Sequence, residues 1–111
     1  MAYDEDLAMR LRVATSGVDG LSEKKMFGGL AFLVNGNMAV AASGQGGLLL
    51  RVDPSQSEEL LDDVAVTRME MRGREMDGWL RVADDAVEDD AALARFVDIG
   101  VGYAGSLPPR R

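Results

Sequence analysis

Apolar side chains recur along the chain with two different periods, and the changes between them mark out the expected elements. Spacings of three and four residues predict amphipathic helices over residues 4–16 and from residue 88 to Pro108. Between these helices, apolar runs and alternation predict strands, interrupted by a helix over 54–62 that begins at the Asp53-Pro54 start signal. The first of five expected strands runs from residue 23 or 24 to 34, and the others span 38–42, 48–52, 66–72 and 79–83.

The longest apolar run carries a turn signal at Asn35-Gly36, and the rest of the chain is expected to organise around it. Both central positions of the favoured two-residue hairpin turn need positive φ, which Asn tolerates and Gly adopts freely. Within the strand that precedes this turn, Gly28-Gly29 has no side chains to pack. We therefore predict a β-bulge or a close backbone approach at these glycines, which lets one long strand bend.

The order helix, three strands, helix, two strands, helix predicts an α+β two-layer sandwich. A five-stranded antiparallel sheet with helices against one face accommodates this order through short connections. The chain of 111 residues, 47% of them apolar, has the size of one domain, which we assign to residues 1–111.

The composition excludes much enzyme chemistry. The sequence has no cysteine and no histidine, so it lacks thiol nucleophiles, thiolate zinc ligands, the usual general base and the commonest metal ligand. We predict no catalytic residue, no cofactor and no metal site, and we expect a protein that is not an enzyme. The acidic residues within 84–90 fit a solvated helix start better than a cation site, because they lack the spacing and glycine of a calcium loop.

Two glycine-rich stretches resemble phosphate-binding loops in the wrong context. The stretch from Gly44 to Gly47 is followed by a strand, not by the Lys-Ser or Lys-Thr pair that opens a helix in a P-loop. Residues 100–105 match the Gly-x-Gly-x-x-Gly pattern inside a predicted helix, without the preceding strand of a dinucleotide site. Close packing of this helix on the sheet, or fraying of its last turns, explains these glycines better.

The net charge restricts the expected partners and compartment. At −7 the chain repels polyanions, so we expect no independent binding to duplex DNA. No basic amino-terminal segment precedes an apolar run, and no run approaches the roughly 18 to 20 residues of a membrane span. We therefore expect a cytoplasmic protein that does not associate with membranes.

The charge is also divided unevenly between the expected layers. The helical segments sum to −10 and the strand segments to +3. If the face with Met69 and Leu80 packs against the helices, alternation places a basic and aromatic set on the opposite face. Arg and Trp are enriched at interface hot spots, although a solvated sheet face with arginine stems shielding the Trp is the alternative. This candidate interaction surface consists of Arg68, Arg72, Trp79 and Arg81.

Several motifs of this sequence resemble those of the TfoX (Sxy) amino-terminal domain family. The resemblance rests on residues 24–32, 35–38, 78–79 and 106–109, and it covers the chain from about residue 3 to 109. The Met-Phe-Gly-Gly and Gly-Trp elements in that order are fairly specific. The structural motif residues are Lys25, Met26, Phe27, Gly28, Gly29, Asn35, Gly36, Gly78 and Trp79.

The resemblance implies a fold of the kind derived above and a regulatory function. Family members in some proteobacteria regulate natural competence with a cyclic-AMP receptor protein, and those transcription regulators typically carry a second, carboxy-terminal helical domain. We expect this chain to be a stand-alone form without that domain. It is then a regulatory or protein-interaction module with an unidentified protein partner, or a homodimer. The alternative is a small-molecule- or anion-binding protein, or an enzyme without His or Cys chemistry.

Overall fold

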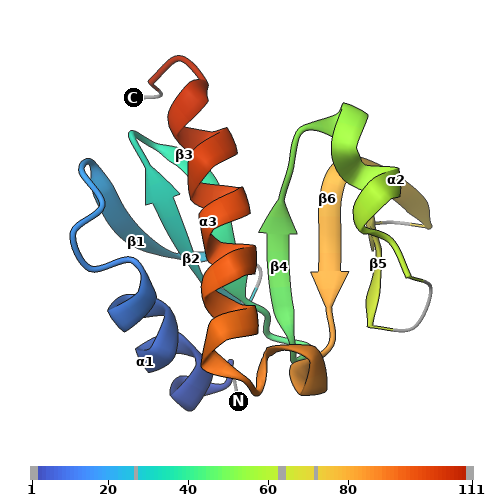
Figure 1. Cartoon of the computed structure of the whole chain (residues 1–111), viewed down its shortest axis with the longest axis horizontal. Helices are drawn as coiled ribbons and strands as arrows, with labels where there is room; N and C mark the ends of the chain where they lie inside the picture. Colours follow the sequence, from blue (N-terminus) through green and yellow to red (C-terminus); the bar gives the residue numbers. More distant parts are fainter. Residues whose placement is uncertain (1–2, 27, 63–64, 72, 110–111) are drawn as a thin grey trace.

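The computed structural model describes residues 3–26, 28–62, 65–71 and 73–109. Its helices are α1 (Glu5–Ala14), α2 (Ser57–Leu60) and α3 (Asp90–Ser106), with 3-10 turns η1 (Pro54–Gln56) and η2 (Asp84–Val87) before the last two. Figure 1 shows α3 lying across the sheet, with α1 and α2 on either side of it. The strands are β1 (Leu21–Met26), β2 (Gly29–Val34), β3 (Asn37–Ala42), β4 (Leu48–Arg51), β5 (Val66–Met71) and β6 (Arg74–Val82).

The strands form one antiparallel sheet in the order β1-β2-β3-β4-β6-β5. The α and β content and the antiparallel pairing agree with the prediction, but the predicted number of five strands is wrong, because the sheet has six. The long first strand is in fact two strands. β1 ends at Met26, β2 begins at Gly29, and these two residues pair with each other, so a hairpin stands where the sequence predicts a bend.

Close backbone packing explains the Gly28-Gly29 pair. Gly28 has φ +77°, a left-handed conformation that favours glycine. A Cβ on Gly29 would lie 2.3 Å from the carbonyl oxygen of Ala42, and one on Gly44 would lie 2.6 Å from the carbonyl oxygen of Gly28. The predicted close approach is confirmed at this pair, while the bulge alternative is wrong: the irregularity of the β2–β3 ladder lies between Phe32 and Leu33.

The predicted turn at Asn35-Gly36 is confirmed. Asn35 has φ +52° and Gly36 has φ +85°, and the flanking residues Val34 and Asn37 pair across the hairpin. Positive φ at both central positions is the conformation that makes the turn follow the twist of the two strands.

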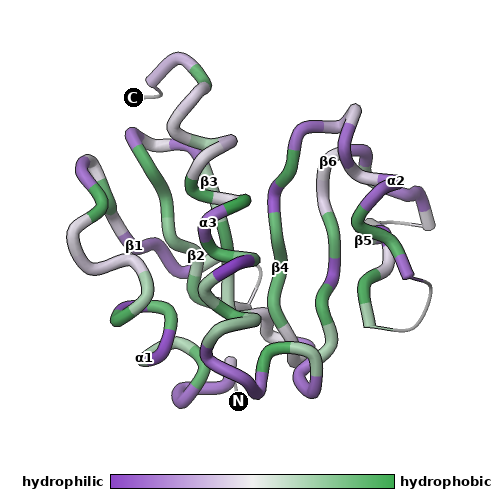
Figure 2. Tube along the Cα trace, viewed as in Figure 1, coloured by the Kyte–Doolittle hydropathy of each residue, from purple (hydrophilic) through white to green (hydrophobic). Residues whose placement is uncertain are grey.

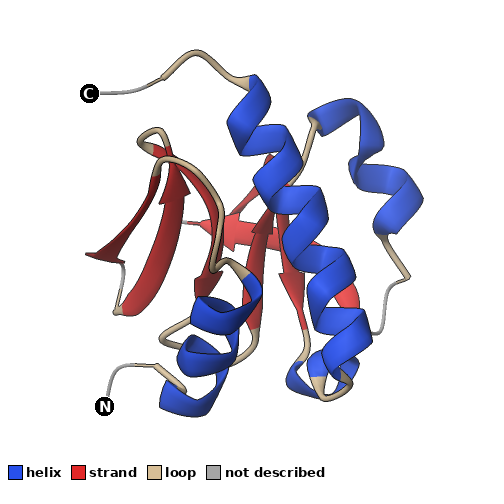
Figure 3. Cartoon of the chain, turned by 60° about the vertical axis from the view of Figure 1, so that its left-hand side comes forward, coloured by secondary structure: helices blue, strands red, loops and turns tan. Residues whose placement is uncertain are grey.

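The helices pack against one face of the sheet through a large apolar cluster, which we call the helix-side core. Figure 3 shows the strands lying behind α1 and α3. At Gly100 the α3 backbone comes so close to β3 that a Cβ would lie 2.6 Å from the carbonyl oxygen of Ala39, which confirms the predicted packing role of this glycine. The core includes Leu7, Leu11, Leu30, Phe32, Val40, Leu48, Leu50, Val66, Leu80, Val82, Leu93, Phe96 and Val97.

A second cluster lies on the other side of the same strands and contains no residue from a described helix. We call it the strand-side cluster. Its buried members are 1% to 9% exposed, and half-buried side chains pack against them. Its members are Ala31, Met38, Ala41, Leu49 and Met69, with Met26, Leu33 and Trp79 at the margin.

The helix start predicted at Asp53-Pro54 is confirmed, because Asp53 caps η1 by accepting a hydrogen bond from the Ser55 amide, and acidic side chains also cap the other two helices. Asp4 caps α1 by accepting hydrogen bonds from the backbone of Asp6 and Leu7, and Asp89 caps α3 by accepting one from Ala91. Figure 2 shows that β4 is largely hydrophobic whereas α2 is largely hydrophilic. Leu60 of α2 and its neighbour Leu61 pack against the helix-side core. No helix in the described parts of the chain is long and apolar enough to cross a membrane.

Candidate interaction surface

Trp79 lies at the margin of the strand-side cluster beneath an arginine. It is half-buried, it pairs with Arg51 in the β4–β6 ladder, and the Arg51 guanidinium carbon lies 5.2 Å from the centre of its ring. The same carbon lies 5.7 Å from the ring centre of Tyr103 on α3. Arg51 therefore contacts two aromatic rings, which attract its charge through their faces without neutralising it.

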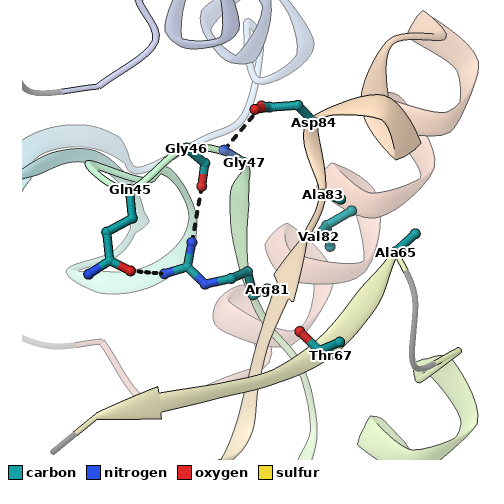
Figure 4. Close-up of a pocket in the computed structure, with 9 residues that line it drawn as sticks. All are labelled: Gln45, Gly46, Gly47, Ala65, Thr67, Arg81, Val82, Ala83 and Asp84. Carbon is teal, nitrogen blue, oxygen red and sulfur yellow. Dashed lines mark hydrogen bonds between the residues drawn. The ribbon is translucent and has the colours of Figure 1, made fainter.

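Arg81 belongs to the same side of the sheet but holds a loop. Its guanidinium donates hydrogen bonds to the Gly46 carbonyl oxygen (3.0 Å), Ser43 Oγ (3.3 Å) and Gln45 Oε1 (3.3 Å). Figure 4 shows this side chain reaching the loop between β3 and β4, at an open hollow of about 310 Å³. The loop is fastened on its other side by Asp84, which accepts a 3.0 Å hydrogen bond from the Gly47 amide.

The two remaining members of the predicted surface do not join Trp79 and Arg81. Arg68 pairs with Leu80, and its Nη2 lies 3.4 Å from Oε1 of Glu58 in α2, so it lies on the helix side and its predicted placement is wrong. Arg72 lies outside the described residues. The prediction assumed that Met69 faces the helix-side core. In the structure Val66 pairs with Val82 in that core, and Met69 packs on the strand side instead.

Three cations lie at strand positions opposite members of the strand-side cluster. Lys24 pairs with Ala31, Arg51 with Trp79, and Arg81 with Leu49, so the register places all three on the face of the strand-side cluster, although the Arg51 guanidinium also reaches Tyr103 of α3. Glu23, the one carboxylate in β1 to β4, pairs with Phe32 on the helix side, whereas β5 and β6 also carry the carboxylates Glu70, Glu75 and Asp77. Within the described part of the chain, none of these three cations forms an ion pair.

Several acidic side chains cap helices or form hydrogen bonds and ion pairs within the chain. Asp89 caps α3, while Asp90 lies 2.9 Å from Arg10 of α1. The hydrogen bond from Arg12 lowers the pKa of Glu23, and backbone and side-chain hydrogen bonds from Ser55 lower the pKa of Asp53. Among residues 3–26, 28–62, 65–71 and 73–109, no group of three or more potential ligand side chains could hold a metal ion.

A protein-family model described as the TfoX N-terminal domain matches residues 14–104 of the 111-residue chain. The chain belongs to the TfoX N-terminal domain family. The matched range begins at the last residue of α1 and ends within α3, so it takes in all six strands of this TfoX N-terminal domain. No curated protein and no solved structure matches the chain.

Most motif residues of the TfoX N-terminal domain have a structural explanation here. Gly28 and Gly29 form the tight contact with the β3–β4 loop, and Asn35-Gly36 forms the hairpin turn. Gly78 has φ +81°, and a Cβ there would lie 2.9 Å from the carbonyl oxygen of Val52. The others differ: Lys25 is exposed on β1, Met26 and Trp79 join the strand-side cluster, and Phe27 lies outside the described residues.

The sequence prediction missed Arg51 and Tyr103. Alternation over Leu48, Leu50 and Val52 does place Arg51 on the opposite face of its strand, and that pattern was the available signal. No local pattern shows that β4 pairs with β6, which is the contact that brings Arg51 to Trp79.

Proposed function

We propose that this TfoX N-terminal domain is a protein-interaction module that binds an acidic segment of a partner on the strand side of its sheet. The observation that carries the proposal is the juxtaposition of an apolar cluster with three cations, Lys24, Arg51 and Arg81, none of which forms an ion pair with a described residue. In this proposal the helices cover one face of the sheet, and the strand side is the uncovered face.

The chemistry of this surface suits recognition of carboxylates beside apolar side chains. Arginine and tryptophan are the residue types most often found at interface hot spots, where a few side chains supply most of the binding energy. The Arg51 guanidinium lies over the Trp79 ring at 5.2 Å, and a partner that desolvates this contact strengthens it. A carboxylate that bonds to the free edge of the guanidinium adds a charge-assisted hydrogen bond.

A regulatory role follows from the same proposal. A domain of net charge −7 that presents cations on one face attracts an acidic protein segment at short range while its overall charge repels nucleic acid. The resemblance to competence regulators then suggests that regulation acts through a protein partner and not through direct contact with DNA. No catalytic step is part of this role.

Affinity capture from the native host with matched variants tests the proposal. Arg51→Glu reverses one charge on the strand side, and Arg95→Glu makes the same change at an exposed position on α3. We expect a partner that the parent and Arg95→Glu capture and that Arg51→Glu loses. A partner retained equally by both variants contradicts the proposed surface.

The hollow beside Arg81 favours one alternative, a small-anion site. It has a volume of about 310 Å³ and is lined by Arg81, Thr67 and the β3–β4 loop, with the carboxylate of Asp84 also in the lining. A thermal-shift screen with phosphate and small carboxylates tests this alternative, because a ligand at a hundred times its dissociation constant stabilises the folded state by about 2.7 kcal/mol. A saturable shift that Arg81→Gln abolishes would support the small-anion site, and no shift with any anion would exclude it.

A further inference from the structure

The two edges of the sheet differ in how their outer backbone groups are satisfied. The sheet begins with β1 and ends with β5. At the β5 edge, Asp62 covers the first residue of the strand. Its amide donates to the Val66 carbonyl oxygen (3.1 Å), and its Oδ1 accepts a hydrogen bond of 2.8 Å from the Val66 amide. The chain itself therefore closes this edge at its start.

The outer edge of β1 has no such cover. The Asn35 amide donates to the Gly20 carbonyl oxygen (2.9 Å), and hydrogen-bonded pairs alternate along an antiparallel ladder. In the register of β1 with β2, this alternation turns the backbone groups of Leu21, Glu23 and Lys25 away from β2. Within the described ranges, no residue forms a hydrogen bond to these outward groups. Figure 1 shows β1 at the margin of the sheet, so its edge is a row of unpaired donors and acceptors that can pair with another extended segment.

The side chains along this edge are exposed and carry positive charge. Residues 22–25, the centre of β1, are all exposed. Glu23 is neutralised by Arg12 of α1, whose Nε and Nη2 lie 2.9 and 3.0 Å from its two carboxylate oxygens. Lys24 and Lys25 form no ion pair with any residue that the structure describes. The edge therefore presents two uncompensated positive charges.

The two lysines lie on opposite faces of the sheet. Lys24 is opposite Ala31 of the strand-side cluster, whereas Lys25 is opposite Leu30 of the helix-side core. Successive side chains of an added strand alternate between the faces in the same way. Two adjacent acidic residues in an extended segment therefore place one carboxylate beside each lysine, and opposite charges on neighbouring strands stabilise their pairing.

The same charges disfavour a second copy of the chain as the added strand. Two-fold antiparallel pairing sets one residue of β1 opposite the same residue of the other copy. A pairing centred on Glu23, Lys24 or Lys25, which uses most of the strand, brings two like charges face to face and destabilises the ladder. Lysine on an exposed edge is a common means of preventing such self-association.

We infer that β1 accepts an extended acidic segment of a partner protein as an added strand. The backbone of the segment bonds to the outward groups of Leu21, Glu23 and Lys25, and its two adjacent carboxylates lie beside Lys24 and Lys25. This edge is a different surface from the one around Arg51, because β2 and β3 lie between β1 and β4. The two surfaces can bind independently, so this step goes beyond the proposed function.

Amide hydrogen exchange of the full chain with a short acidic peptide tests the added strand. The probe is the capped peptide Thr-Val-Asp-Glu-Val-Thr. At about ten times its dissociation constant, the amides of Leu21, Glu23 and Lys25 should exchange about tenfold more slowly than in the free protein, because the edge is then open about a tenth of the time. Methylation of every second backbone nitrogen of the peptide should abolish binding in one phase and not in the other, since only one row of its amides faces β1.

Charge reversals provide the matched variants. Lys25→Glu changes an exposed side chain, so it should fold like the parent, and it should raise the dissociation constant in calorimetric titration about tenfold. Arg95→Glu, at an exposed position of α3, should leave that constant unchanged. The peptide with Lys-Lys in place of Asp-Glu should not bind.

Several outcomes would overturn the inference. These are no binding at millimolar peptide, unchanged exchange of the three amides at saturation, and equal affinity of the parent and Lys25→Glu. Binding that Arg51→Glu loses and Lys25→Glu keeps would place the peptide on the strand-side surface instead. Protection that rises with protein concentration alone would make a second copy the added strand.

Discussion

The two faces of the sheet are buried by different means. The helix-side core receives side chains from every described α-helix, and Phe32, Val40 and Leu50 in it have no exposed area. The strand-side cluster is built from strand residues alone, and its margin carries Trp79 with Arg51 above its ring. The helices cover one face of the sheet, whereas the other face is packed only by side chains of the strands themselves.

This difference separates the parts that hold the fold from the parts that are available for recognition. Side chains with no exposed area contribute their full transfer free energy to folding and offer nothing to a partner. Half-buried aromatic and basic side chains are ordered by their neighbours and still present atoms to another surface. Substitutions on the two faces should therefore differ in how much stability they cost.

Truncation in the helix-side core should be the most damaging change. Phe32→Ala removes a ring with no exposed area, and we expect a loss of about 3 to 5 kcal/mol in the free energy of unfolding. Its neighbour Leu33 is half-buried on the strand side, so Leu33→Ala should cost only about 1 kcal/mol. Urea unfolding of both variants measures the difference, and equal losses would show that the two faces are equally important for stability.

Two glycines on α3 should respond to alanine with opposite signs. A Cβ on Gly100 would lie 2.6 Å from the Ala39 carbonyl oxygen, whereas one on Gly102 meets no atom within 4 Å. Gly100→Ala should destabilise by about 1 to 3 kcal/mol through forced separation of α3 from β3. Gly102→Ala should stabilise by roughly 0.5 to 1 kcal/mol, because alanine favours the helix. Thermal unfolding checks both signs, and a loss at both positions would contradict the docking of α3.

The contact between Arg51 and Trp79 should matter little for stability. A double-mutant cycle with Arg51→Ala and Trp79→Ala should give a coupling of about 0.5 to 1 kcal/mol, the range for a cation over a ring at a partly exposed site. Each single variant should keep a cooperative unfolding transition. A coupling of several kcal/mol would mean that the pair serves folding, and it would weaken the argument for recognition.

The ion pair between Arg12 and Glu23 should give a small acid dependence. The Arg12 hydrogen bond lowers the pKa of Glu23 in the folded state, so the pair stabilises the fold above the ordinary glutamate pKa of about 4.3. That stabilisation is lost as the pH falls through the lower folded-state pKa. Both side chains are partly exposed, so solvent screening keeps the effect small. In urea unfolding at several pH values, Glu23→Gln should slightly reduce the fall of the free energy of unfolding at acid pH. An unchanged acid dependence would contradict the stabilising role of this ion pair.

Local signals in the sequence predicted local structure well. The Asp53-Pro54 start signal, the Asn35-Gly36 pair and the α3 stripe each have a short-range physical cause, and the structure has the predicted helix start, turn and helix. The division of the first long strand was missed because an apolar run has the same pattern whether the strand continues straight or the chain reverses at a glycine pair. At Gly28-Gly29 the deciding contact is with Gly44, which is distant in sequence.

The candidate surface was harder to predict because strand faces depend on register. Residues 66–71 alternate, and both of their faces carry apolar side chains, so the sequence alone does not decide which face is covered. The pairing of Val66 with Val82 decides it, and it moves Arg68 away from Trp79. Trp79 and Arg81 were placed together correctly because both lie on one strand, where alternation alone is sufficient.

The most direct test of the proposed recognition surface is an NMR titration with a hexaglutamate peptide. The single tryptophan supplies an indole N–H signal on the strand side, and backbone amides report on both faces of the sheet. We expect saturable shifts at the Trp79 indole and in β4 and β6 around Arg51 and Arg81, which Arg51→Glu abolishes and Arg95→Glu retains. Shifts confined to the helices, or no saturable shift at the Trp79 indole, would contradict the account.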